Sequence, residues 1–335
     1  MKKNLISLTV ASALLLPVVA QSADDVTVYG RVHMSYGQVT EEAGGVTAVD
    51  NWQVRSHDSR LGVKGSRDFG NGLSGIYKIE FGVNPDSDLV SAGDGTAGIV
   101  RRNQYVGLKG GFGEFIIGRH DTPLKMAQGK FDQFGDTDGD LKHAGAQDGE
   151  HRFDNIVALK GKSGDFGYAI AVAPGEDNGT GGTADTGPAD TVSFSVSYNA
   201  GPLYIALAQD SYENGENLAS DSLTRMVVTY KMAEMQLGLL YQTGVEKPAA
   251  ATAEEDWIGL SFNMKAGDNG KLKAQYIMVE DNAATVTEST LTAVGYDYKF
   301  DKKTTGYVMY TSVQSDTGPV SSEDTFMGAG MVLKF

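Results

Sequence analysis

The sequence contains no cysteine among its 335 residues, so neither a disulfide framework nor a thiolate metal site is available. Small secreted modules usually need such cross-links, and their absence argues against that class. Basic residues are also scarce, because 28 lysines and arginines stand against 43 aspartates and glutamates and give a formal net charge of −15. Nucleic-acid binding requires the opposite sign to neutralise phosphates, so we expect no nucleic-acid partner.

Long apolar runs are missing beyond the start of the chain. The single run, from Leu5 to Ala20, follows Lys2 and Lys3 and precedes small residues. This order predicts a secretory signal peptide, residues 1–23, cleaved after Ala23; cleavage after Ala20 also fits the small-residue rule. A helical span needs roughly 20 apolar residues, and no later window approaches that length. The remaining classes are a soluble periplasmic protein, a secreted protein and an outer-membrane barrel.

Glycine and aromatic residues are abundant, with 43 glycines, 15 tyrosines and 13 phenylalanines, which favours turns and strands over helices. From Val26 onward, apolar and polar residues alternate, and turn-forming clusters interrupt the alternation. The pattern predicts sixteen strands in one domain, residues 24–335. Their approximate ranges are 26–36, 51–67, 72–84, 99–110, 113–120, 152–162, 165–173, 190–199, 202–210, 222–233, 235–243, 255–265, 270–280, 289–300, 304–313 and 324–335.

The connections between these strands alternate between short turns and long polar loops. Seven short turns are predicted at 67–72, 110–113, 162–165, 199–202, 232–234, 266–270 and 300–304, and long loops such as 174–190 and 244–254 lie between them. Sixteen strands with both termini on the short-turn side need seven such turns, and the asymmetry is typical of outer-membrane barrels.

The alternation also assigns the two faces of the sheet. In the first strand, Val28 and Val32 share one parity and Arg31 and His33 the other, and an apolar face in the last strand ends on Phe335. A soluble β-sandwich also alternates, but the strand count and the loop asymmetry favour a closed barrel with an apolar outside. We therefore predict an all-β fold, a transmembrane antiparallel β-barrel.

Several short stretches resemble the general, trimeric porins of Gram-negative outer membranes. They are 26–31 (VTVYGR), 59–65 (SRLGVKG), 68–73 (DFGNGL), 79–82 (IEFG), 105–110 (YVGLKG), 118–123 (GRHDTP) and the terminal Phe335. The resemblance implies a passive, water-filled channel for small hydrophilic solutes and ions, a homotrimer, contact with outer-membrane lipid and lipopolysaccharide, and recognition of Phe335 by the barrel-assembly machinery.

The resemblance also implies that the third long loop, residues 121–151, folds into the lumen as a constriction loop. Its length without strand character is itself typical of a functional segment. The acidic residues that we expect at the constriction are Asp121, Asp132, Asp136, Asp138 and Asp140, and the loop also carries Asp148 and Glu150. The centre, 132–136 (DQFGD), resembles the loop tip of enteric porins but has Gln133 at the position of their glutamate, which leaves open which aspartate acts there.

Opposite this loop the family has a ladder of basic residues on the barrel wall. By parity and motif we expect the basic wall to comprise Arg31, Arg60, Lys64, Lys78, Arg102 and Arg152. A wet lumen tolerates such charges, whereas Arg or Lys facing lipid at the midplane costs about 2–4 kcal/mol. Arg119 shares the outward parity of Phe115 and Ile117, so we predict a place for it at the subunit interface, with lipid headgroups as the alternative partner.

Other motifs do not support a different chemistry. The five histidines lack metal-site spacing, and we expect no metal and no cofactor. Residues 136–140 resemble part of a calcium loop with misplaced glycine, so divalent-cation binding stays open. A general channel is favoured over a substrate-specific one because most strand aromatics fall on the outward parity. A phospholipase-like barrel enzyme and an adhesin are further alternatives. Loop acidity favours cations in the channel, whereas the arginines favour anions.

Overall fold

The computed structural model describes residues 24–86, 98–146, 149–175, 187–212, 220–246, 254–282 and 287–335. The predicted signal peptide, residues 1–23, lies outside these ranges, as does most of the loop between residues 84 and 98. Within the described ranges, no helix has the length and apolar character needed to cross a membrane.

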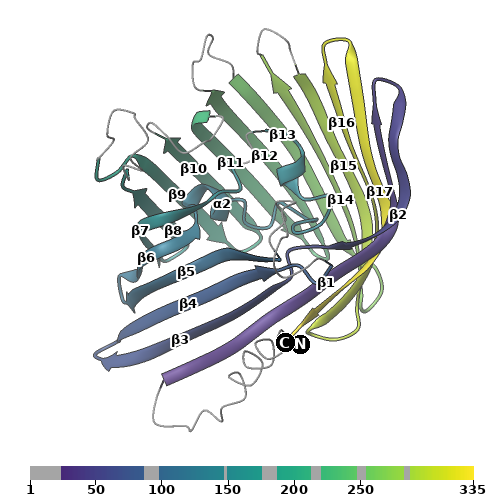
Figure 1. Cartoon of the computed structure of the whole chain (residues 1–335). Helices are drawn as coiled ribbons and strands as arrows, with labels where there is room; N and C mark the ends of the chain where they lie inside the picture. Colours follow the sequence, from purple (N-terminus) through teal and green to yellow (C-terminus); the bar gives the residue numbers. More distant parts are fainter. Residues whose placement is uncertain are drawn as a thin grey trace, which may run out of the picture.

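The chain forms a closed antiparallel β-barrel (Figure 1). From β3 to β17 consecutive strands pair with each other, and β1 pairs with β17 from Arg31 to Ala43, which closes the ring. The strands are β1 (Asp24–Ala43), β2 (Val46–Ser56), β3 (Arg60–Gly70), β4 (Leu73–Val83), β5 (Ile99–Gly110), β6 (Gly113–Asp121), β7 (Arg152–Ser163), β8 (Phe166–Ala173), β9 (Thr191–Ala200), β10 (Leu203–Tyr212), β11 (Ser220–Met232), β12 (Met235–Glu246), β13 (Glu254–Lys265), β14 (Gly270–Asp281), β15 (Thr287–Lys299), β16 (Thr304–Thr317) and β17 (Val320–Lys334).

The predicted second strand, 51–67, is in fact two strands. β2 pairs with the C-terminal half of β1 and β3 with its N-terminal half, so together they fill one position and the ring has sixteen positions. The break falls at His57–Ser59, where Asp58 adopts a positive φ of 48°. Aspartate tolerates this left-handed conformation as a single residue, because its short polar side chain can bond locally. The alternation on both sides of the break concealed it in the sequence.

All seven predicted short turns are confirmed, and they lie at the same end of the barrel as Phe335. The opposite end differs from the prediction at two places. β1 and β2 continue to a two-residue turn, Gly44–Gly45, and β16 and β17 meet in a similarly tight turn. Both glycines have positive φ, as the favoured two-residue hairpin turns require. Long loops are therefore absent from these two connections.

The barrel has an apolar outer face and a mixed inner face. Outward residues such as Val106, Val196 and Leu260 are exposed by 52–62%. Phe335 closes the ring at the short-turn end, where its N–H donates to the Gly30 carbonyl (3.1 Å) and its carbonyl accepts from the Gly30 N–H (3.2 Å). The predicted outward parity of the last strand is confirmed.

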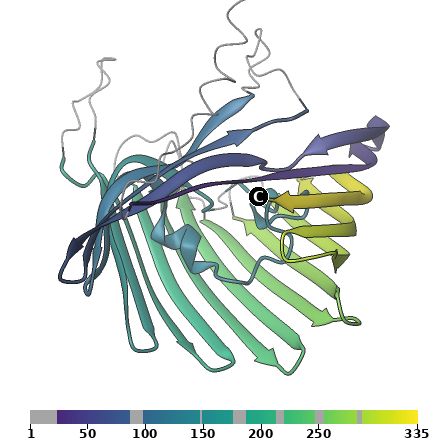
Figure 2. The same cartoon turned by 90° about the horizontal axis from the view of Figure 1, so that it is seen from below.

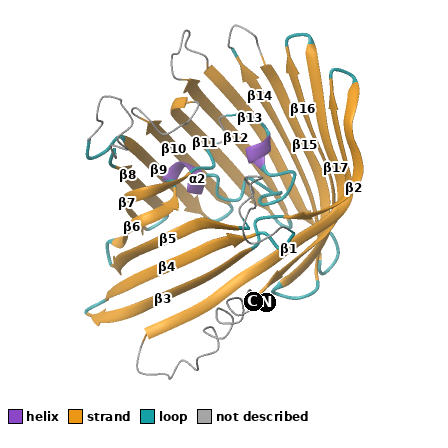
Figure 3. Ribbon diagram, in the orientation of Figure 1, coloured by secondary structure: helices purple, strands orange, loops and turns teal. Residues whose placement is uncertain are grey.

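The segment between β6 and β7 lies inside the ring (Figure 2) and, in its described residues, contains only two short helical turns (Figure 3). α2 (Pro123–Ala127) begins with Thr122, whose hydroxyl accepts the Lys125 N–H, and η2 (Leu141–His143) begins with Asp140. α2 packs against β9 and β10. The expectation that this segment has no strand and enters the lumen is confirmed for the part that the structure describes.

Two neighbouring positions on β9 test the assignment of faces. Val196 faces out and Ser197 faces in. Val196→Lys should destabilise the folded barrel in phospholipid vesicles by about 2–4 kcal/mol, whereas Ser197→Lys should change its stability little, because the lumen holds water. Urea titrations of the two variants measure this difference. Equal losses of stability in the two variants would show that Val196 does not face lipid while Ser197 faces water.

Candidate pore constriction

The loop between β6 and β7, here called the constriction loop (residues 121–151), is fixed to the inner wall by an apolar core. Phe131, Phe134 and Leu141 are fully buried against wall residues that include Trp257 and Ile277. These inward apolar positions on β11 to β17 would be unfavourable in a water-filled lumen, and the loop removes them from water. The loop path is therefore dictated by the apolar part of the wall.

A buried ion pair holds the returning end of the loop. The Arg225 guanidinium on β11 is fully buried and lies 2.9 Å from the Glu150 carboxylate, and its Nε donates to the Gln242 side chain. Burial raises the pKa of Glu150 to about 7, against the opposing effect of Arg225. Such a pair is costly to break from one side, because the remaining partner stays buried without compensation.

The loop tip meets the basic wall at Asp136. Its Oδ2 lies 2.7 Å from Arg31 Nη2 and 3.0 Å from Arg60 Nη2. Both guanidiniums also donate from Nε to the Asp58 carbonyl at the strand break. The break thus supplies an acceptor that orients the two arginines toward the loop.

The wall contributes carboxylates of its own, which the sequence reasoning missed. Asp58 binds Arg102 and Lys142, and Glu80 binds Arg102 and Lys78 (3.1 Å each). Burial opposes the charge on Lys142, but Asp140 and Asp58 outweigh it and raise its pKa. The parity shared with Lys78 could have identified Glu80, whereas the break at residues 57–59 hid Asp58.

A third group of charges lies where the loop leaves and rejoins the barrel. Asp121 contacts Arg152 (2.7 Å) and Lys125 (3.2 Å), and it accepts a hydrogen bond from Asn103. The Arg152 Nε donates to the Asn103 side-chain oxygen. Asp121 and Arg152 thus belong to the same network from opposite ends of the loop.

The other predicted loop aspartates do not contact the basic wall ladder. Asp132 is half-buried and accepts the N–H groups of Phe134 and Leu141, and burial together with Asp140 raises its pKa well above its usual range. Asp140 accepts the Asp136 N–H and caps η2. Asp138 pairs instead with Arg55 on β2. Asp148 lies outside the described residues.

Three predicted residues lie away from the loop tip. Lys64 is exposed in the lumen, 5.3 Å from the Tyr29 ring centroid, and makes no ion pair in the described ranges. Arg119 faces outward, as its parity indicated, and contacts Asp154, which also binds Arg101. Phe335 closes the ring as described above. Among the described residues, no group of histidines and carboxylates could hold a metal ion.

The buried anchor at Arg225 generates a prediction for the loop. Arg225→Met leaves Glu150 without its cation, and loss of one partner of a buried pair costs about 3–5 kcal/mol. Hydrogen exchange of the loop amides between residues 122 and 146 should therefore accelerate strongly, while the strand amides stay protected. Lys231→Met, on the same strand but exposed, serves as the control. Unchanged loop protection in Arg225→Met would show that the ion pair does not hold the loop.

Comparisons with known proteins agree with this architecture. Outer membrane porin protein 32 of Delftia acidovorans is 27% identical over 324 residues, covering 92% of this chain and 88% of the relative. Major outer membrane protein P.IB of Neisseria lactamica is 26% identical over the full length of both chains. Among solved structures, an anion-selective porin from Comamonas acidovorans superposes with a TM-score of 0.77 at 22% identity, over 93% of this chain and 100% of the other. The trimer form of OmpT from Vibrio cholerae gives 0.70 at 20% identity, over 94% and 100%.

The family profile described as Gram-negative porin matches residues 7–318, nearly the whole chain. The chain therefore belongs to the Gram-negative porin family, and it is an outer-membrane channel for the passive diffusion of small hydrophilic solutes and ions.

Proposed function

We propose that this porin is a general diffusion channel that prefers anions, formed by a cleaved precursor and assembled as a homotrimer. The observation that carries the anion preference is the pairing at the constriction. Each of four carboxylates there contacts two cationic side chains: Asp136 with Arg31 and Arg60, Asp121 with Arg152 and Lys125, Asp58 with Arg102 and Lys142, and Glu80 with Lys78 and Arg102.

Arg102 is shared, so seven cationic side chains stand against four carboxylates in this network. A narrow throat with low-dielectric walls focuses this surplus and raises the local concentration of anions. Two of these carboxylates, Asp121 and Asp136, come from the loop, and two of the cations, Lys125 and Lys142, come from the same loop. The neighbour from Comamonas acidovorans is named an anion-selective porin, which agrees with the proposal.

The acidic character of the chain as a whole does not argue for a cation channel. Many carboxylates lie at the strand ends opposite the short turns, including Glu41, Glu42, Glu254, Asp256, Glu323 and Asp324. Fields from exposed charges decay over about 8 Å at physiological ionic strength, so carboxylates farther than this from the constriction act mainly on the channel mouth. Glu41 and Asp324 lie nearer, because they line a cavity together with Arg55 and Asp138. The proposal involves no catalytic turnover.

The charged group on the outer wall supports a trimer. Arg119, Arg101 and Asp154 lie on β5 to β7 among exposed apolar residues such as Ile117. Charges facing lipid are unfavourable, and a neighbouring subunit would supply polar partners for the surplus arginine. We assign the remaining partners in the same way: outer-membrane lipid and lipopolysaccharide at the outer face, and the barrel-assembly machinery at Phe335.

The surplus of cationic side chains at the constriction predicts how ion selectivity changes when arginines are removed. Replacing Arg31, Arg60 and Arg102 together by Gln removes positive charge from the throat, and two charges 4 Å apart in water interact by about 1 kcal/mol. The anion-to-cation permeability ratio should fall by at least about fivefold, measured as the reversal potential across planar bilayers in a salt gradient. Arg67→Gln removes an outward arginine from β3 and should leave the ratio unchanged. A wild type that prefers cations would refute the proposal.

Arg119→Leu tests the trimer interface. Leucine suits lipid, so the barrel should fold, but trimers should dissociate in mild detergent more readily than wild-type trimers. Light scattering after size-exclusion chromatography measures the oligomer. Arg67→Leu, also outward and exposed, should remain trimeric. Undiminished trimer stability in Arg119→Leu would place Arg119 outside the interface.

A further inference from the structure

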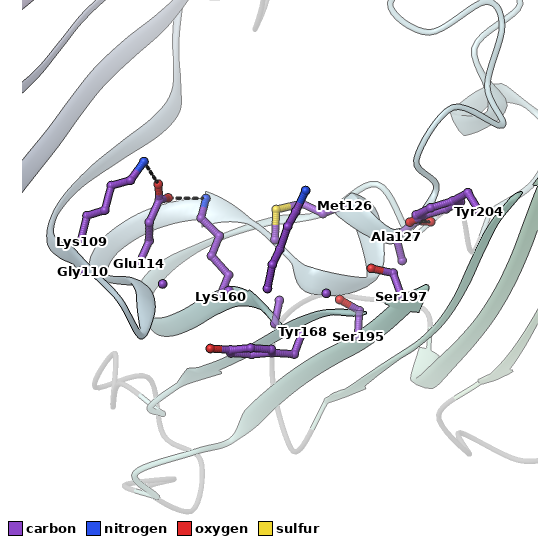
Figure 4. Close-up of a pocket in the computed structure, with 15 residues that line it drawn as sticks. Lys109, Gly110, Glu114, Met126, Ala127, Lys160, Tyr168, Ser195, Ser197 and Tyr204 are labelled. Carbon is purple, nitrogen blue, oxygen red and sulfur yellow. Dashed lines mark hydrogen bonds and ion pairs between the residues drawn. The ribbon is translucent and has the colours of Figure 1, made fainter. Parts of the chain in front are cut away.

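A cavity of about 530 Å³ opens in the lumen on the short-turn side of the constriction loop (Figure 4). Its lining comes from β5 to β10 and from α2, with Met126 and Ala127 of α2 on one side and Ser195 and Ser197 of β9 beside them. The volume falls within the range of small-molecule sites, which span roughly 300–1,000 Å³. We call this cavity the lysine recess.

One side of the lysine recess is cationic. Lys109, Lys160 and Lys162 line it, and Glu114 is the single carboxylate among the lining residues. Glu114 lies between Lys109 (3.1 Å) and Lys160 (3.4 Å), as the dashed lines in Figure 4 show. Lys162 is exposed to the lumen and makes no ion pair within the described part of the chain. The recess therefore retains a cationic group that is available to an anion.

The other side of the lysine recess is apolar and rigid. The Tyr204 hydroxyl donates to the Ala127 carbonyl (2.9 Å), which ties the Tyr204 ring to α2. Met126 and Ala169 complete this surface, and a thioether adapts to ligands of varied shape. An inorganic ion cannot use such a surface, whereas a solute with an apolar body can bury part of its area there.

The lysine recess also adjoins the constriction. Lys160 Nζ lies 3.4 Å from His120 Nε2, and His120 precedes Asp121 of the ion-pair network. We infer that the lysine recess is a binding subsite for organic anions that combine a carboxylate with an apolar or aromatic body. The carboxylate contacts Lys160 and Lys162, and the body lies against Met126 and Tyr204. This inference rests on the proposed anion preference and names the class of solute that the channel retains.

Benzoate tests the inference, with acetate as the matched anion that lacks an aromatic body. Benzoate should reduce the chloride current of the wild-type channel in planar bilayers at concentrations at which acetate does not. The half-blocking concentration should rise about tenfold in Lys160→Gln/Lys162→Gln, as expected for the loss of a charge-assisted contact. Ala169→Leu, which fills the recess without changing its charge, should weaken the block similarly. Lys271→Gln, a lumenal lysine on the opposite wall, should not.

The same recordings separate the two proposals. Equal effects of benzoate and acetate, or a benzoate block that neither recess variant weakens, would overturn the subsite while an anion-selective reversal potential kept the proposed function intact. A cation-selective wild type would overturn the proposed function and the premise of the subsite together.

Discussion

Closure of the sheet between β1 and β17 is the constraint on which the rest of the structure depends. A spanning sheet has no water with which to satisfy its backbone groups, so every strand needs two neighbours and no edge can remain open. Once the ring is closed, successive side chains face lipid and lumen in turn. The lumen then accepts arginines and lysines that would be unfavourable facing lipid at the midplane. The need to pair every backbone hydrogen-bonding group thus closes the ring, and the closed ring encloses the channel.

The interior of the barrel is divided between a wet and a dry part. On β11 to β17 a cluster of inward positions is apolar, and Phe131, Phe134 and Leu141 of the constriction loop cover it. Arg225 and Glu150 fix the returning chain at the edge of this dry region. The loop is held against one side of the barrel for the same reason that a soluble protein forms a core.

The electrostatic character of the constriction depends on the side chains that lie there and not on the net charge of the chain. The chain is strongly acidic, yet four carboxylates at the constriction are each bound by two cations, and loop and wall both contribute charges of both signs. Loop Asp136 pairs with wall Arg31 and Arg60, while Asp58 and Glu80 add carboxylates to the wall itself. The fields of exposed carboxylates at the strand ends decay over about 8 Å at physiological ionic strength. Arrangement in space, and not composition, determines which ions the throat favours.

The sequence by itself determined most of the strands, the seven short turns, the outward face ending on Phe335 and the inward parity of residues such as Arg60. These follow from neighbouring residues, because alternation and turn chemistry are local. Tertiary structure alone decided the break at Asp58 and the partner of each charge. Arg60 and Asp136 are 76 positions apart, and Arg225 and Glu150 are 75 apart. No local rule connects such pairs, because the loop path depends on which wall residues lack a partner once the barrel has closed.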